Sequence, residues 1–173
     1  MSTRVLILMG SDSDFPAMSA AVDVLDQFGV SSACHVASAH RSPKRVQDLL
    51  HGAEADGAQV VICAAGMAAH LAGVVASKTL LPVLGVPLEG GPGLAGVDAL
   101  YSTVMMPPGI PVGTLAIGKP GARNAAYLAL AILSLSDTAL RKRLGDWRAG
   151  LESAVAAADE KVQAQLAQRK KPQ

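Results

Sequence analysis

Residues 5–16, VLILMGSDSDFP, indicate the class of fold because they join a buried strand to the start of a helix. Val5 to Met9 form a continuous apolar run, which is typical of a parallel strand covered on both faces. Ser11 to Asp14 supply preferred N-cap residues, and Pro16 suits the first turn of a helix. Apolar residues then recur at helical spacing until Gly29 breaks the pattern. We therefore expect a strand, a tight turn and a helix.

The same pattern recurs along the rest of the chain. It predicts further strands at 32–37, 60–64, 82–86 and 112–117, and helices at 42–55, 67–78, 95–104 and 122–135. This alternation predicts an α/β fold, a three-layer flavodoxin-like sandwich with a parallel sheet between helices. Residues 137–168 add a C-terminal helix with no strand after it. Such an added helix often packs on a neighbouring subunit, so we expect a homo-oligomer.

The length and composition indicate one domain of small apolar side chains. The chain has 173 residues, of which half are hydrophobic but only 3% aromatic. We expect a single catalytic domain over residues 1–168 and a disordered tail at 169–173, where Arg169, Lys170 and Lys171 form a short basic end. The Gly- and Pro-rich segment 87–93 is the best candidate for a mobile loop, either a plain connection or a lid.

The charge pattern and the N-terminus exclude several classes of partner. Fifteen basic residues nearly cancel fourteen acidic ones, so no basic face for nucleic acid is indicated. The N-terminal apolar run is too short for a signal peptide or a membrane span, and we expect a cytoplasmic protein without a membrane partner. Cys34 and Cys63 have no metal-binding spacing and are interpreted as small buried hydrophobes. The sequence has no signature for zinc, a nucleoside triphosphate or a dinucleotide.

Polar residues gather where the first three predicted strands end. The clusters are residues 10–14, 38–43 and 64–73, and ligands of open α/β sheets bind beyond the carboxyl ends of the strands. In the first, the serine hydroxyls and a helix N-terminus suit an anion, while Asp14 suits ribose hydroxyls; simple helix capping is the alternative. In the second, His40 can move protons near neutral pH, and the planar fork of Arg41 suits phosphate or carboxylate. Taken alone, His70 in the third cluster is a packing or hydrogen-bonding residue.

The three clusters resemble a known family. GSDSD (10–14), SAHRSP (38–43) and AAGMAAHLAG (64–73) are similar to motifs of the 5-(carboxyamino)imidazole ribonucleotide mutases of purine biosynthesis. So are LPVLGVP (81–87), GIPVGTLAIGKPGARNAA (109–126) and LGDWR (144–148). The resemblance implies a three-layer α/β fold, a homo-octamer, no metal and no organic cofactor. It also implies a reaction that moves a carboxylate from an exocyclic nitrogen to a ring carbon of an aminoimidazole ribonucleotide.

The motifs carry residue roles with them. The resemblance implies that Ser11, Asp14 and Arg41 bind the ribonucleotide with help from Ser13 and Ser38, and that His40 is the general acid/base. It also implies that the pocket around the imidazole and the migrating carboxylate is lined by Gly66, His70 and Leu71.

Two alternative functions stay open on the sequence. A sister branch of the family carboxylates aminoimidazole ribonucleotide directly with carbon dioxide, but His70 and Arg41 favour the mutase branch. A non-catalytic nucleotide- or flavin-binding domain has the same sheet topology, although few aromatics are present to stack on a flavin. The chain differs from the usual mutase motif where Met67 replaces a glycine and Ala72 a proline. The loop 88–97 is also one residue longer than in the usual mutases. These changes border the expected pocket.

Overall fold

The first 133 residues form a three-layer α/β unit around a parallel sheet, as the sequence predicts. The structure is a computed structural model that describes residues 2–91 and 94–169. Its five strands are β1 (Val5–Met9), β2 (Ser32–Val36), β3 (Val60–Gly66), β4 (Val83–Leu88) and β5 (Gly113–Thr114). They are ordered β2-β1-β3-β4-β5, the flavodoxin-like order, and every pair is parallel.

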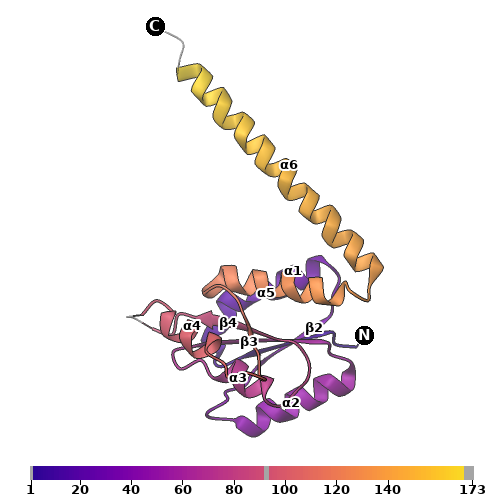
Figure 1. Ribbon diagram of the computed structural model, residues 1–173, viewed down its shortest axis with the longest axis vertical. Helices are drawn as coiled ribbons and strands as arrows, with labels where there is room; N and C mark the ends of the chain where they lie inside the picture. Colours follow the sequence, from indigo (N-terminus) through magenta and orange to yellow (C-terminus); the bar gives the residue numbers. More distant parts are fainter. Residues whose placement is uncertain (1, 92–93, 170–173) are drawn as a thin grey trace. The chain divides into compact units, whose positions relative to one another are not determined.

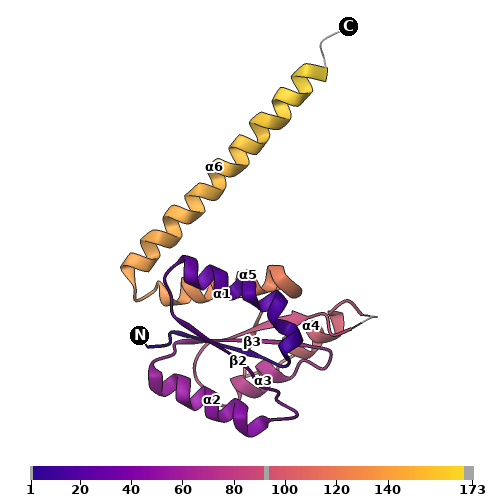
Figure 2. The ribbon, with the colours of Figure 1, turned by 180° about the vertical axis from the view of Figure 1, so that it is seen from behind.

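Helices cover both faces of this sheet (Figure 1). One face carries α1 (Phe15–Gln27), which follows the short 3-10 turn η1 (Asp12–Asp14), and α5 (Gly118–Leu133). The other carries α2 (Pro43–Asp56) and α3 (Leu71–Ala76), while α4 (Val97–Val104) packs against β4 and β5. The view from behind shows the same two layers (Figure 2).

The core follows from the apolar strands that identified the fold. All five residues of β1 are buried, because β1 lies between β2 and β3 and is covered by helices on both faces. Ile7 of β1 pairs with Cys34 on one side and Ile62 on the other. Cys63 is buried as expected, whereas Cys34 is only partly buried because β2 is an edge strand.

Several predicted boundaries are wrong, and the causes are local. The helix expected from Met67 begins only at Leu71, since Met67 has a φ of +55°, which a right-handed helix does not allow. The helix expected from Ala95 likewise begins at Val97 after a φ of +48° at Ala95. Strand β5 has two residues instead of six because it pairs only with Leu84 and Gly85 of β4.

The remaining residues form a second unit, Ser134–Gln173, which contains α6 (Thr138–Arg169). A helix of 32 residues is about 48 Å long. Pro92 and Gly93 of the predicted mobile loop, and residues 170–173 of the predicted tail, lie outside the described residues. No helix within the described ranges is both long enough and apolar enough to cross a membrane.

Candidate active site

The three polar clusters meet in one cavity, as the strand-end rule predicts. The cavity has a volume of about 490 Å³, within the usual range for small-molecule sites. Every site residue expected from the sequence lines it: Ser11, Ser13, Asp14, Ser38, His40, Arg41, Gly66, His70 and Leu71. The convergence arises because β1 lies between β2 and β3, so the loops after these strands are neighbours.

The loop after β1 is held by a capping box. The Ser11 hydroxyl accepts a hydrogen bond from the Ser13 amide, and the Asp14 carboxylate accepts one from the Ser11 amide at 2.9 Å. The same side chains cap the helix and line the cavity, so helix capping does not exclude a role in ligand binding. Ser13 also donates its hydroxyl proton to the Ser11 oxygen at 3.0 Å, so the two hydroxyls lie side by side.

Burial sets the electrostatics of Asp14. Removal from water raises the pKa of its carboxyl above the ordinary value, and hydrogen bonds from the backbone amides of Ser11 and Gly10 offset part of that shift. Repulsion by the neighbouring Asp12 raises the pKa of Asp14 slightly further. A partly buried carboxylate of this kind accepts hydrogen bonds from neutral hydroxyls better than it tolerates an anion.

The loop after β2 is folded back on itself and tied to β1. The Ser42 hydroxyl accepts from the Ser38 amide at 3.0 Å and lies 3.2 Å from the Ser38 carbonyl oxygen. Arg41 donates from its guanidinium to the Gly10 carbonyl at 3.1 Å, and its backbone amide donates to the Ser38 hydroxyl at 3.2 Å. The Nε atom of Arg41 also donates to the Ser38 hydroxyl at 3.5 Å, so the side chain is anchored at two nitrogens while its exposed guanidinium stays on the cavity wall.

A histidine pair joins the second and third loops. The Nε2 atom of His40 and the Nδ1 atom of His70 are 2.9 Å apart, with the rings nearly perpendicular at 82°. A hydrogen bond between two imidazole nitrogens requires that one carries a hydrogen and the other does not. The sequence pattern alone identified His70 as a packing or hydrogen-bonding residue; the structure shows an exposed, hydrogen-bonded side chain at the start of α3.

The apolar part of the cavity lining comes mainly from the loop after β3. Its lining residues there are Ala65, Gly66, Met67, Ala68 and Leu71. Gly90, beyond β4, closes this side, and its place in the cavity was missed by sequence reasoning. The same strand-end rule applied to β4 would have found it.

Other candidate residues lie elsewhere. His35 faces a separate cleft between β2 and α2, and His51 is exposed on α2. Within the residues that the structure describes, no three His, Cys, Asp or Glu side chains are grouped so that they could share a metal ion.

Comparison with known proteins gives a consistent result. A family model described as AIR carboxylase matches residues 4–154. N5-carboxyaminoimidazole ribonucleotide mutase of Escherichia coli (strain K12) is 53% identical over 145 residues, which cover 84% of this chain and 85% of that relative. The protein of the same name from Brucella melitensis is 51% identical over 156 residues, covering 90% and 96% of the two chains.

A solved structure agrees with the sequence relatives. The crystal structure of Treponema denticola PurE matches with a TM-score of 0.83 at 29% identity, covering 92% of this chain and 98% of that one. The family match spans most of the sequence, and the two relatives exceed half identity over more than four fifths of the chain. On these grounds the chain belongs to the AIR carboxylase family.

Proposed function

We propose that this chain is an isomerase of de novo purine biosynthesis that converts 5-(carboxyamino)imidazole ribonucleotide to 4-carboxy-5-aminoimidazole ribonucleotide. The relatives that carry the mutase name support this assignment. The observation that carries it is the make-up of one cavity: a polar side for a phosphorylated sugar, an apolar side for a neutral gas, and an imidazole pair as part of its lining.

The polar side would bind the ribonucleotide. Arg41 offers a charged, planar donor, and the hydroxyls of Ser11, Ser13 and Ser38 offer neutral donors, which together suit a phosphate. Asp14 would repel a phosphate, so we assign it to the ribose hydroxyls. The anchoring of Arg41 on Gly10 fixes the guanidinium before the ligand arrives, which lowers the entropy cost of binding.

His40 would handle the protons of the reaction. In the first step the bond between the carboxylate carbon and the exocyclic nitrogen breaks, carbon dioxide leaves, and that nitrogen gains a proton. In the second step the electron pair of the ring carbon attacks carbon dioxide and forms a carbon–carbon bond. The ring carbon then loses its proton and aromaticity returns. The substrate gains one proton at the exocyclic nitrogen and loses one from the ring carbon, so a single imidazole can supply the first and accept the second.

His70 would position His40 and share its proton. The hydrogen bond between them holds the His40 ring against rotation. If both facing nitrogens carried hydrogens the bond would break, so with the bond intact the two facing nitrogens hold one hydrogen between them.

The apolar side would hold the carbon dioxide between the two steps. Free carbon dioxide is dilute and would diffuse away, whereas a molecule held over the ring carbon reacts at a high effective concentration. Gly66 and Ala68 leave room for a flat ring close to the backbone, and Leu71 supplies a buried apolar surface.

The assay that tests this function uses two substrates in parallel. Purified protein is given the carboxyamino ribonucleotide in one reaction and aminoimidazole ribonucleotide with bicarbonate in the other. Turnover of the first substrate is expected. Efficient turnover of the second substrate alone would assign the chain to direct carboxylation. If neither substrate is turned over, the chain would be assigned as a non-catalytic nucleotide-binding domain.

We also propose that the chain works as a cytoplasmic homo-octamer in which residues 1–168 form one catalytic domain. The length of α6 supports oligomer formation, since every described side chain from Arg148 to Ala167 is exposed in the single chain. In proteins, most of the stability of a helix comes from packing against other elements, so α6 is expected to contact another subunit. Light scattering at micromolar concentration tests this, and a monomer would contradict it.

A further inference from the structure

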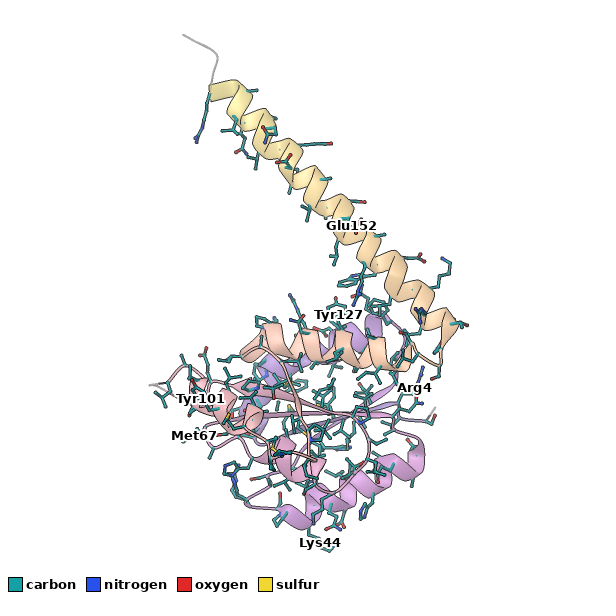
Figure 3. The ribbon with its side chains drawn as sticks, viewed as in Figure 1. Arg4, Lys44, Met67, Tyr101, Tyr127 and Glu152 are labelled. Atoms are coloured by element: carbon teal, nitrogen blue, oxygen red, sulfur yellow. The ribbon has the colours of Figure 1, made fainter. Side chains whose placement is uncertain are left out.

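Ser42 lies at the N-cap of α2 but does not cap the helix. A serine in this position usually accepts a hydrogen bond from a backbone amide of the first helical turn. The Ser42 hydroxyl makes no such bond. The first turn, where Figure 3 labels Lys44, is exposed, so water can bond to its amides instead. The hydroxyl of Ser42 is therefore available for another purpose.

The Ser42 hydroxyl is turned back onto the backbone of Ser38. It accepts a hydrogen bond from the Ser38 amide at 3.0 Å and donates one to the Ser38 carbonyl at 3.2 Å. The Ser42 amide donates to the same carbonyl at 2.9 Å. One hydroxyl can donate once and accept twice, so both of its bonds can exist together. Ser42 thus bonds to both backbone polar groups of Ser38 and closes the turn at residues 39–41.

The closed turn carries two side chains on which the proposed reaction depends. His40 extends from it to His70, with 2.9 Å between their nitrogens, and Arg41 extends to the Gly10 carbonyl. Arg41 is also bonded to the Ser38 hydroxyl through its amide and its Nε atom. His40 and Arg41 are exposed, so packing contributes little to holding them. Their positions depend instead on the hydrogen bonds of the turn.

Loss of the Ser42 hydroxyl would open the turn at one point. The Ser38 carbonyl would keep its bond from the Ser42 amide, whereas the half-buried Ser38 amide would lose its bond to the hydroxyl. A new partner for that amide requires entry of water or a shift of the backbone. A shift of about 1 Å at a reacting group can cost about 10²-fold in rate, so a small movement of the turn is enough to matter.

We propose that Ser42 is a positioning residue: its hydroxyl closes the turn at residues 38–42 and so holds His40 and Arg41 in place before the substrate arrives. This inference rests on the proposed function, because it concerns the residues assigned there to proton transfer and phosphate binding. Ser42 does not line the cavity, so it touches neither the nucleotide nor the reacting atoms. It moves no proton to the substrate and acts only through the geometry of the turn.

Two measurements test this role. Calorimetric titration with aminoimidazole ribonucleotide gives the dissociation constant and the number of binding sites, and steady-state turnover of the carboxyamino ribonucleotide gives kcat per binding site. Ser42→Ala is expected to lower kcat per site about tenfold and to raise the dissociation constant severalfold, since one hydrogen bond that positions both side chains is lost. The number of sites should stay that of the wild type, because the fold is retained.

Three further variants separate the hydroxyl from the rest of the fold. Ser42→Thr keeps the hydroxyl and is expected to restore both values. Ser102→Ala is the matched control and should behave like the wild type, because Ser102 is also half-buried and donates to a backbone carbonyl, that of Asp98, but does not line the cavity. In an Arg41→Ala background, Ser42→Ala should raise the dissociation constant no further, since the two residues act through one contact.

The outcomes distinguish this inference from the function on which it rests. Absence of turnover by the wild type would overturn the proposed function, while the dissociation constants would still test Ser42. Unchanged kcat per site and dissociation constant in Ser42→Ala would overturn the positioning role. An equal loss in Ser42→Thr would also overturn it, because the hydroxyl would not be the acting group. So would a fall in the number of sites alone, which indicates unfolding, or an equal further rise of the dissociation constant in the Arg41→Ala background.

Discussion

The Nε2 atom of His40 lies 2.9 Å from the Nδ1 atom of His70, although the two residues are 30 positions apart in the sequence. The contact forms because the loops that follow β2 and β3 reach across the end of β1 from either side. It joins a candidate general acid/base to a second imidazole in the wall of one cavity.

Replacing His40 removes the group proposed to move protons. His40→Asn is expected to lower kcat by about 10²–10⁴-fold, since that is the usual contribution of a positioned acid or base. Circular dichroism should be unchanged because His40 is exposed. His51→Asn is the matched control, as His51 is also exposed but lies on α2 away from the cavity. Full activity in His40→Asn would refute the catalytic assignment.

Replacing His70 tests the positioning of His40. His70→Ala is expected to lower kcat by about two- to tenfold, which corresponds to the loss of one hydrogen bond. The substrate KM should change less than kcat. His70→Gln, which can still donate or accept a hydrogen bond, should recover part of the activity. A large rise in KM with an unchanged kcat would instead make His70 a binding residue.

Arg41 is expected to act mainly in binding. Arg41→Lys replaces a planar donor by a single ammonium group, so we expect KM to rise about tenfold or more while kcat changes little. Arg45→Lys is a matched control, because Arg45 also donates to a backbone carbonyl, that of Val36, but does not line the cavity. Steady-state kinetics of both variants would show the difference, and equal effects would argue against a specific contact by Arg41.

Asp14 gives a stability effect with a defined pH dependence. Burial raises the pKa of its carboxyl in the folded state, so the folded protein holds this proton more tightly than the unfolded chain. Its contribution to stability is therefore lost as pH rises from the ordinary aspartate pKa of 3.8 through the raised pKa of the folded state. Asp14→Asn does not ionise, so its free energy of unfolding relative to wild type should be highest near neutral pH and decline toward pH 4.

Urea unfolding from pH 7 to pH 4 measures this difference. The same variant should bind nucleotide more weakly at pH 7 if Asp14 contacts the ribose. A stability difference that is constant over the pH range, or that grows as pH falls, would contradict the raised pKa.

An interior strand of the sheet should tolerate truncation of its side chains less well than an edge strand. Ile7 is fully buried between two neighbouring strands, and Ile7→Ala is expected to lower the free energy of unfolding by about 2–5 kcal/mol. Val36→Ala, on the edge strand, leaves no internal cavity because Val36 is exposed, and should cost much less. Equal losses in chemical denaturation would contradict the burial of β1 between β2 and β3.

Local signals in the sequence are sufficient to predict the order and type of the elements. Buried parallel strands are continuously apolar, and helix starts carry caps and prolines, so both leave local signals that residues 5–16 display in full. The rule that ligands bind at the carboxyl ends of strands then placed the three polar clusters at one edge, and resemblance of the motifs supplied residue roles. These inferences needed no contact between distant residues.

The contacts between the clusters depend on how the strands are arranged in three dimensions. The His40–His70 hydrogen bond and the contact of Arg41 with Gly10 depend on which strands are neighbours, and this information is not local. The late start of α3 has the same origin. The composition of residues 67–70 favours a helix, but packing of Met67 against Gly90 accompanies a positive φ there, and the loop stays open around the cavity. Long-range packing overrides local propensity at this site, and it shapes the cavity wall that the proposed chemistry requires.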